Sequence, residues 1–279
     1  MKQISNDIAG ARLNGYIWDG APFSDSSRKR PCVIVCPGGG YTHLSPREGE
    51  PVALRFYTEG YSAFVLEYSV FRDETEWGCR PLWPKPLEQL SFAVAYVRKN
   101  AAELGIDASD ITVIGFSAGG HLAACLGTNY NRYEFCTKLG IGEGMNRPDR
   151  LILGYSCLSG LLLKKDRRTR IAELLLGRQS VTDEELSGIN AINFVSETTP
   201  PSFVFHTFGD ESVPCEDSIA FARKLHSFSV PCELHVFSKG AHGFSLGNET
   251  TAASDEHILK SASMWFELCL EWLSQLRNE

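Results

Sequence analysis

Short apolar runs alternate with amphipathic segments along most of this chain of 279 residues. The runs are largely continuous rather than alternating, which is typical of parallel strands that are buried on both faces. The predicted strands are residues 32–36, 63–68, 112–115, 151–156, 202–207 and 233–237. The predicted helices are residues 47–59, 86–104, 121–128, 217–227 and 257–276. This alternation predicts the α/β class, with a mostly parallel central sheet flanked by helices.

Two regions interrupt the alternation. Residues 69–85 are rich in tryptophan and proline, which predicts an ordered loop rather than a linker. Residues 158–199 contain a helical stretch and a second helix start, which either Ser180 or Thr182 would cap. We predict that residues 158–199 form a small helical insert over the carboxyl edge of the sheet, within a single domain of residues 1–279.

Composition and charge limit the partners and the compartment. A formal net charge of −7 argues against binding to nucleic acid or to acidic membranes. The first residues have no apolar core of the kind that a signal peptide needs. The longest apolar-rich stretch, residues 151–163, is too short to span a bilayer. We therefore expect a cytoplasmic protein without membrane contact.

The chain has nine cysteines, but no two of them form a CxxC pair. Zinc sites and thioredoxin-like centres, which such pairs indicate, are therefore not expected. Most of the cysteines lie in apolar segments, so we expect reduced and buried thiols.

Residues 115–119, Gly-Phe-Ser-Ala-Gly, lie between the apolar run 111–114 and a segment that favours a helix. A strand, a sharp turn and a helix in this order present a serine as a nucleophile, and the turn needs glycines because Cβ atoms would clash there. The helix directs its N–H groups at the serine, where negative charge would develop. The pentapeptide alone is weak evidence in a chain with 25 glycines, but its context makes Ser117 the candidate nucleophile.

A serine hydroxyl attacks only when a base takes its proton, and a carboxylate must orient that base. His242 is the favoured base because it lies in a glycine-rich loop directly after the predicted strand 233–237. His257 is the competitor, but it falls within the predicted last helix. His235 falls within a strand, where packing is the expected role.

The orienting carboxylate is expected in the loop after the preceding strand, residues 202–207. Asp210 lies in that loop, and the glycine before it lets the strand end turn sharply. Glu211 is the adjacent alternative, whereas we interpret Asp217 as the N-terminal charge of the next helix. The segment between Asp210 and His242 has room for the helix and the strand that a β-α-β unit requires.

The oxyanion of a tetrahedral intermediate needs backbone N–H donors from two places. One donor is the residue after the nucleophile, Ala118. The second is expected from residues 37–41, Pro-Gly-Gly-Gly-Tyr, which follow a predicted strand and whose glycines let the backbone approach a substrate oxygen. These residues lack the lysine and the serine or threonine of a phosphate-binding loop.

Four segments are informative as a set. They are Pro-Gly-Gly-Gly-Tyr at 37–41, Gly-Phe-Ser-Ala-Gly-Gly-His-Leu-Ala at 115–123, Gly-Asp-Glu-Ser-Val-Pro at 209–214 and His-Gly-Phe at 242–244. Together they resemble the α/β-hydrolase serine esterases, with the bacterial acetyl esterase or acetyl-xylan-esterase-like branch as the nearest group. The resemblance covers most of the chain and implies the α/β-hydrolase fold.

The resemblance also implies a catalytic triad and an oxyanion hole. The triad would consist of Ser117, Asp210 and His242, and the oxyanion hole of the N–H groups of Gly39, Gly40 and Ala118. The chain departs from the hormone-sensitive-lipase branch at Pro37, where that branch has a histidine that braces the loop. No metal and no organic cofactor is required for this chemistry.

The substrates that the resemblance implies are short acyl esters, with O-acetyl groups of small carbohydrates as the leading candidates. Imported oligosaccharides or small metabolites would then be the small-molecule partners. A feruloyl esterase and an arylformamidase-like amide hydrolase are the alternatives within the fold. A catalytically silent α/β-hydrolase that binds a partner is the alternative from another class, although such relatives generally lack the serine or the histidine.

Aromatic rings stack well on the apolar faces of sugars. Tyr41, His43 and Trp83 are therefore candidate substrate-binding residues, and so are Tyr68 and Trp77, with ordinary packing as the alternative for each. The apolar last helix could pack on the sheet or on a second copy of the chain, so a homo-oligomer stays open.

Overall fold

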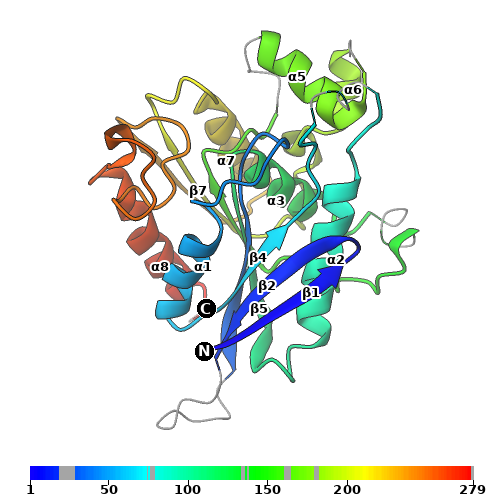
Figure 1. Cartoon of the computed structure of the whole chain (residues 1–279), viewed down its shortest axis with the longest axis vertical. Helices are drawn as coiled ribbons and strands as arrows, with labels where there is room; N and C mark the ends of the chain where they lie inside the picture. The colour runs from blue at the N-terminus through cyan, green and yellow to red at the C-terminus, as the bar shows by residue number, and fades with distance from the viewer. Residues whose placement is uncertain are drawn as a thin grey trace.

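The computed structural model describes residues 1–18, 29–73, 75, 79–132, 136, 138–159, 165–178 and 182–277. They form an eight-stranded sheet in the order β1-β2-β4-β3-β5-β6-β7-β8 (Figure 1). The strands are β1 (Lys2–Ile8), β2 (Ala11–Ile17), β3 (Arg30–Cys36), β4 (Ser62–Glu67), β5 (Ile106–Phe116), β6 (Arg150–Gly154), β7 (Ser202–Thr207) and β8 (Cys232–Phe237). The α-helices are α1 (Glu50–Thr58), α2 (Lys85–Lys99), α3 (Ala118–Asn129), α5 (Lys165–Leu176), α6 (Asp183–Ser187), α7 (Glu216–Ser227) and α8 (Trp265–Gln275). The 3-10 helices are η2 (Ala191–Phe194), η3 (Asp255–His257) and η4 (Ala262–Met264).

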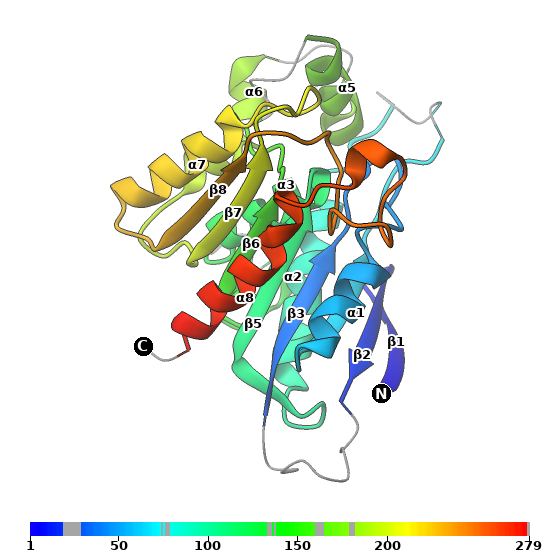
Figure 2. The ribbon, with the colours of Figure 1, turned by 90° about the vertical axis from the view of Figure 1, so that its left-hand side faces the viewer.

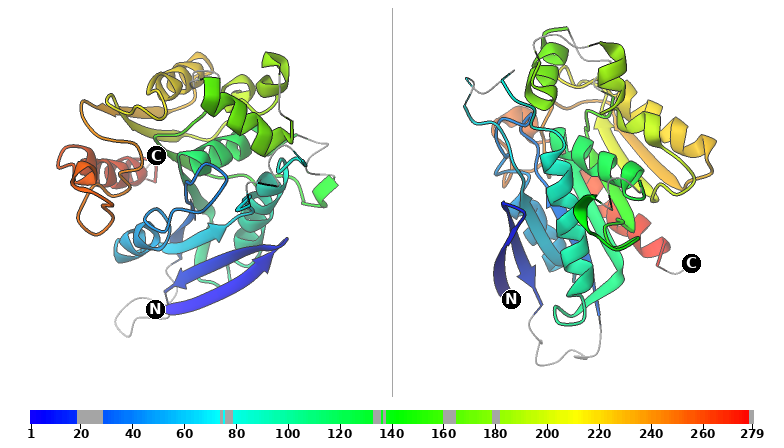
Figure 3. Two further views of the ribbon diagram at one scale, coloured as in Figure 1. Left: turned by 45° about the horizontal axis from the view of Figure 1, so that its top comes forward. Right: turned by 90° about the vertical axis from the view of Figure 1, so that its right-hand side faces the viewer.

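The six strands from β3 to β8 run parallel to one another, and all six were predicted from the apolar runs. Helices α1 and α8 cover one face of the sheet (Figure 2), and α2, α3 and α7 cover the other (Figure 3). Two buried apolar clusters result, one on each face, which explains why the central strands are apolar throughout. The predicted fold class is therefore confirmed.

The first two strands were not predicted. β1 and β2 form an antiparallel hairpin, and β2 pairs antiparallel with β4 at the edge of the sheet. Within β1, Ile4 and Ile8 are the apolar residues, and most of the other side chains are exposed. An edge strand with solvent on its outer side lacks the continuous apolar run that marks the buried strands.

The last predicted helix, residues 257–276, begins later in the structure. The 3-10 helices η3 and η4 precede α8, so His257 lies in η3 and not in the last α-helix, which corrects the prediction. Ile258 and Met264 are 43% and 49% exposed, so these two apolar residues do not extend the buried stripe of α8.

Helices α5 and α6 lie over the carboxyl ends of the parallel strands (Figure 2), where the sequence predicts an insert within residues 158–199. Thr182 caps α6, because its hydroxyl accepts from the N–H of Glu185 while the Glu185 carboxylate accepts from the N–H of Thr182. The alternative cap, Ser180, lies outside the described residues. Within the described part of the chain, every helix is too short or too polar to cross a membrane.

Candidate active site

Ser117 lies at a sharp turn between the end of β5 and the start of α3. Its φ is +51°, in a region that residues other than glycine rarely adopt, so the surrounding backbone must hold it there. The two glycines of the motif are required because neighbouring backbone carbonyl oxygens approach them closely. A Cβ at Gly115 would lie 2.1 Å from the carbonyl oxygen of Gly119, and a Cβ at Gly119 would lie 2.1 Å from that of Cys36. The motif is thus fixed by its packing against β3.

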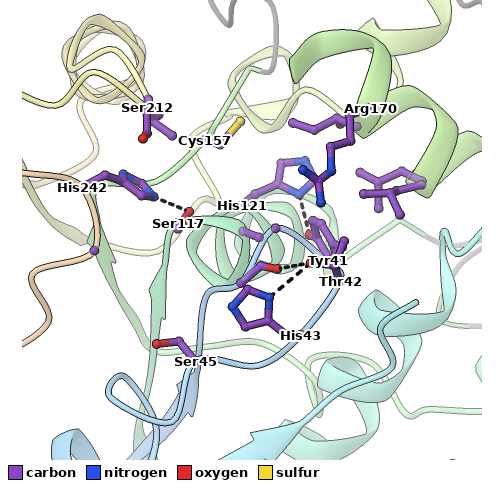
Figure 4. A pocket seen from close by; sticks show the side chains of 18 of the residues that line it. Tyr41, Thr42, His43, Ser45, Ser117, His121, Cys157, Arg170, Ser212 and His242 are labelled. Atoms are coloured by element: carbon purple, nitrogen blue, oxygen red, sulfur yellow. Dashed lines mark hydrogen bonds between the residues drawn. The ribbon is translucent and has the colours of Figure 1, made fainter. Parts of the chain in front are cut away.

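Three side chains from separate loops form a hydrogen-bonded relay. The Oγ atom of Ser117 lies 2.8 Å from Nε2 of His242 (Figure 4), and Nδ1 of His242 lies 2.6 Å from Oδ2 of Asp210. Asp210 follows β7 and His242 follows β8, so the parallel topology brings both loops to the carboxyl end of β5. Because a carboxylate accepts, Nδ1 of His242 carries the proton and Nε2 is left to accept from the serine hydroxyl.

The Asp210 carboxylate is buried and surrounded by donors. Its Oδ1 atom accepts from the N–H groups of Ser212 at 2.8 Å and Val213 at 2.9 Å. Its Oδ2 atom lies 3.2 Å from Nε2 of His206, in addition to its contact with His242. Burial alone would raise the pKa of the Asp210 carboxyl, but hydrogen bonds from His206 and His242 outweigh it and hold the pKa well below its ordinary value. Asp210 therefore stays ionised.

His206 is a member of this network that the sequence did not point to. It is fully buried on β7, where its Nε2 atom also lies 3.0 Å from the carbonyl oxygen of Val213 and its Nδ1 atom lies 2.8 Å from Oγ of Ser218. Both neighbours of Nε2 are acceptors, so Nε2 carries the proton and donates to Asp210. The signal in the sequence that could have indicated His206 was a histidine directly after the apolar run 203–205 of a predicted buried strand.

The alternative candidates for base and acid lie outside the relay. Glu211 is exposed to solvent. His235 is on β8, with its Nε2 atom 2.7 Å from Oε1 of Glu233. His257 contacts the backbone of the base and not its ring, with its Nε2 atom 3.2 Å from the backbone oxygen of His242.

Asp217 has a larger role than the predicted N-terminal charge of α7. It is fully buried, and it accepts hydrogen bonds from the N–H of Ser159 at 3.1 Å and from its Oγ at 2.5 Å. Burial raises the pKa of the Asp217 carboxyl, and the hydrogen bonds from Ser159 and from the Leu158 backbone offset this only in part. Asp217 thereby fixes the point at which the chain enters the insert.

The glycine loop after β3 faces the same turn. Gly39 has a φ of +127° and Gly40 a φ of +60°, and a Cβ at Gly39 would lie 2.1 Å from the carbonyl oxygen of His43. Within the described part of the chain, the N–H groups of Gly39, Gly40 and Ala118 donate to no protein acceptor. Since all three residues line the cavity beside Ser117, these N–H groups are available to a ligand oxygen.

A cavity of about 440 Å³ lies beside Ser117 and has two walls of different chemistry. The strand-end wall consists of loops after the parallel strands, within residues 39–48, 117–121, 157–159, 212–213 and 242–243. The insert wall consists of Arg170 and of the aliphatic side chains of Ile171, Leu174, Leu175, Leu186 and Ile189. Part of the cavity is shown in Figure 4, with His242 on one side of Ser117 and Tyr41 on the other.

Two of the predicted substrate-binding residues, Tyr41 and His43, line this cavity. Tyr41 is only 3% exposed, and its hydroxyl lies 2.7 Å from Nδ1 of His121, so it forms a wall rather than an open stacking platform. His121 is buried, which lowers its pKa, and its Nε2 atom lies 2.7 Å from the carbonyl oxygen of Ile189 in the insert wall. The Tyr41 hydroxyl therefore donates to His121.

The structure does not bring the other predicted aromatic residues to the cavity. Trp83 packs against His121, with 5.6 Å between ring centroids, and lines a separate cavity of about 170 Å³. Tyr68 is buried, and its hydroxyl donates to the carbonyl oxygen of Pro37 at 2.6 Å, beneath the glycine loop. Trp77 lies outside the described residues. Tyr68 thus packs beneath the loop, and Trp83 lies at a second cavity rather than at the one beside Ser117.

Metal ligands were not expected from the sequence. Among the described residues, no group of three or more His, Cys, Asp or Glu side chains is arranged to hold a metal ion.

Residues 22–225 match the model of the family BD-FAE. The chain belongs to the BD-FAE family. The matched residues include the glycine loop, the turn at Ser117 and Asp210, whereas His242 lies beyond them.

Among curated proteins, this BD-FAE chain is similar to endo-1,4-beta-xylanase B of Butyrivibrio fibrisolvens, with 37% identity over 227 residues. That match covers 79% of this chain but 33% of the xylanase, and the next curated relatives are covered over about half of their length. Among solved structures, the chain is similar to an acetyl ester-xyloside bifunctional hydrolase from Caldicellulosiruptor lactoaceticus, with 35% identity and a TM-score of 0.76 over 95% of this chain and 88% of that chain. It is also similar to the carboxylesterase Cest-2923 from Lactobacillus plantarum WCFS1, with 27% identity and a TM-score of 0.84 over 99% and 97% of the two chains.

These matches confirm the predicted α/β-hydrolase family and the predicted enzyme class, that of carboxylic ester hydrolases. The family model covers β3 to β7 with the loops of Ser117 and Asp210, and the two solved relatives match 95% and 99% of this BD-FAE chain.

Proposed function

We propose that this chain hydrolyses short acyl esters through an acyl-enzyme intermediate, with Ser117 as nucleophile, His242 as general base and Asp210 as the orienting acid. The relay carries the proposal: 2.8 Å separate Oγ of Ser117 from His242, and 2.6 Å separate His242 from Asp210. A serine, a histidine and a carboxylate in this geometry activate the hydroxyl for attack on an acyl carbon.

The steps follow from the position of each proton. Ser117 attacks the ester carbonyl while Nε2 of His242 takes its proton, and the ionised Asp210 stabilises the resulting imidazolium. The alcohol leaves with that proton. A water molecule, activated by His242 in turn, then hydrolyses the acyl-enzyme and restores Ser117.

We propose that the N–H groups of Gly39, Gly40 and Ala118 bind the oxyanion of both tetrahedral intermediates. Their lack of a protein acceptor supports this role, because an unpaired donor at a helix start or in a glycine loop is ready to bind developing negative charge.

The proposed substrates are O-acetyl groups of small carbohydrates. The relatives named as a xylanase and as an acetyl ester-xyloside hydrolase support this choice. A cavity of about 440 Å³ is in the size range of small-molecule sites. The leaving alcohol must lie near Nε2 of His242, so the acyl group points away from it, toward Tyr41, His121 and the insert wall.

The first test is hydrolysis of p-nitrophenyl acetate by the wild type and by Ser117→Ala. We expect a loss in kcat/KM of at least about 10⁴-fold in Ser117→Ala. Ser45→Ala is the matched control, because Ser45 lines the same cavity without contact to the relay, and it should stay within about 3-fold of the wild type. A wild type that hydrolyses no short acyl ester would contradict the proposed function.

The second test concerns the substrate. Acetylated xylo-oligosaccharides, methyl ferulate and N-formylkynurenine should be compared by kcat/KM with the same preparation. We expect the acetylated oligosaccharides to be hydrolysed fastest. A faster reaction with methyl ferulate or with the formamide would replace the proposed substrate and leave the proposed mechanism in place.

A further inference from the structure

Glu48 is a buried carboxylate beside the cavity that the proposed mechanism does not use. It is 3% exposed, and its two oxygens accept from different parts of the molecule. Oε2 accepts from the N–H of Gly38 at 2.8 Å, and Oε1 accepts from the hydroxyl of Tyr155 at 2.7 Å. A buried carboxylate is costly unless it is hydrogen-bonded, so its position indicates a defined role.

The first contact of Glu48 fixes the glycine loop. Gly38 immediately precedes the proposed oxyanion donors Gly39 and Gly40, and a Cβ at Gly38 would lie 2.7 Å from Oε2 of Glu48. Together with the bond from Tyr68 to Pro37, this contact holds the loop from both sides. Glu48 thus braces the loop that carries two of the proposed oxyanion donors.

The second contact leads to the loop that carries His242. The hydroxyl of Tyr155 donates to Glu48 and accepts from the N–H of Ser245 at 2.9 Å. The ring of Tyr155 also packs edge-on against His242, with 5.2 Å between centroids. Tyr155 has a φ of +36°, which is rare for a tyrosine and is held by the packing around it.

Arg47 makes a parallel connection beside Glu48. Its guanidinium donates to the carbonyl oxygens of Gly243 at 2.8 Å and Thr251 at 3.0 Å, and its own carbonyl oxygen accepts from Oγ of Ser245 at 2.7 Å. Two consecutive residues therefore fasten the loop of the proposed base to the loop of the proposed oxyanion donors.

We propose that Glu48, through Tyr155, is a positioning residue that sets the proposed oxyanion donors relative to His242, with Arg47 as a second connection. This inference rests on the proposed function. The donors Gly39 and Gly40 and the base act on the same tetrahedral intermediate but come from loops after β3 and β8, which are not neighbours in the sheet. Their relative position must hold to within about 0.5 Å for full activity.

The test compares Glu48→Gln and Tyr155→Phe, both with p-nitrophenyl acetate. A glutamine can still accept from Gly38, but it presents a donor to the Tyr155 hydroxyl, while phenylalanine keeps the ring and removes the hydroxyl. We expect each variant to lower kcat about 10- to 100-fold and to change KM less than about 3-fold. The double variant should be no slower than the slower single variant, because both break one connection.

Glu50→Gln is the matched control. Glu50 also accepts from a tyrosine, Tyr16 at 2.8 Å, but that pair lies away from the cavity. We expect its kcat to equal that of the wild type within about 2-fold.

Two further readouts separate positioning from folding. Active sites should be titrated with a fluorophosphonate, so that kcat refers to folded enzyme, and the Ki of phenylboronic acid should be measured, since it forms a tetrahedral adduct on the serine. We expect Ki to rise in proportion to the loss in kcat/KM.

Wild-type kcat per titrated site and wild-type Ki in both variants would overturn the inference, and so would a loss of activity at constant Ki. Additive losses in the double variant would overturn the connection through Tyr155.

If Glu48→Gln does not fold, Tyr155→Phe alone decides the outcome by the same two readouts. A wild type that is inactive on all esters refutes the proposed function instead, so the two failures are distinguishable.

Discussion

The strand-end wall and the insert wall of the cavity are held in place in different ways. The strand-end wall consists of turns that parallel strands fix, and buried side chains such as Glu48 and Tyr155 bind its polar atoms. The insert wall contributes mostly aliphatic side chains beside Arg170, and backbone hydrogen bonds of 3.2 and 3.0 Å tie Leu174 and Leu175 to the loop before α2. Fixed polar groups suit bond making and breaking, whereas an aliphatic surface suits selection by size.

This difference implies two kinds of response to substitution. A change in the strand-end wall should alter the rate with every ester, because all esters share the same tetrahedral intermediate. A change in the insert wall should alter the ratio of rates between esters and leave the common chemistry in place.

After the loss of Ser117, the largest effect is expected at the buried end of the relay. Asp210→Asn should lower kcat/KM about 10³- to 10⁴-fold with acetate and butyrate esters alike, because the amide can no longer hold His242 in the required tautomer. Glu211→Gln is the adjacent control, and it should be active because Glu211 is exposed. A loss below about 10-fold in Asp210→Asn would remove Asp210 from the proposed triad.

The next effect is expected on the free energy of unfolding, which a glycine substitution should lower in the strand-end wall but not in the insert. In Gly119→Ala, the new Cβ would lie 2.1 Å from the carbonyl oxygen of Cys36, and backbone atoms cannot yield cheaply, so unfolding should become easier by more than about 3 kcal/mol. Gly188→Ala tests the insert, where φ is −68° and the nearest atom, the Glu185 carbonyl oxygen, would be 3.4 Å away.

Gly188→Ala should be neutral or stabilising by up to about 1 kcal/mol, since its backbone already suits alanine. Urea unfolding curves followed by tryptophan fluorescence measure both changes. Equal destabilisation in the two variants would mean that the walls do not differ in rigidity.

The strand-end wall was also the part that could be predicted from the sequence. Ser117 and Asp210 each follow an apolar run that marks a buried strand, His242 follows the half-buried edge strand β8, and glycines mark the turns. The contacts that support them could not be predicted, because their partners are distant in the chain: Glu48 and Tyr155 are 107 positions apart. Such pairs depend on how the strands are ordered in the sheet.

The misplaced elements have a similar cause. β1 lies at the edge of the sheet with most of its side chains exposed, and β2 interrupts its apolar residues with Arg12, Asn14 and Gly15, so neither strand shows a continuous apolar run. His257 was assigned to the last helix because apolar residues follow it, although this segment forms the short 3-10 helices η3 and η4. Trp83 was assigned to the cavity by residue type alone, while its position depends on the packing of α2 against α3.

A smaller effect is expected from the insert wall. Leu175→Ala should raise the ratio of kcat/KM for the butyrate ester to that for the acetate ester about 3- to 10-fold, because it makes room for a longer acyl chain. Leu176→Ala is the control on the same helix, since Leu176 does not line the cavity, and its ratio should be unchanged. The ratio does not depend on the folded fraction. An equal ratio in both variants would place the acyl group elsewhere.

The smallest effect lies where the two walls meet, at Asp217. Burial raises the pKa of Asp217 above its ordinary value of 3.8, so its favourable contribution to stability is complete below that pH and is lost as the pH rises through the folded-state pKa. Asp210 has a lowered pKa and the opposite dependence, with stability that is present above pH 3.8 and lost as the pH falls.

Comparison of the wild type with Asp217→Asn isolates the pH dependence that Asp217 causes. Asp210 titrates alike in both proteins, so its contribution cancels when the two free energies of unfolding are subtracted. The free energy of unfolding of the wild type, minus that of Asp217→Asn, should therefore fall as the pH rises above 3.8 and then become level. Urea titrations at half-unit intervals from pH 3.5 to about 7 measure this difference. A difference that is constant with pH would mean that Asp217 ionises as freely in the folded chain as in the unfolded one. The hydrogen bonds from Ser159 would then offset the whole desolvation cost of the Asp217 charge at the junction of the two walls.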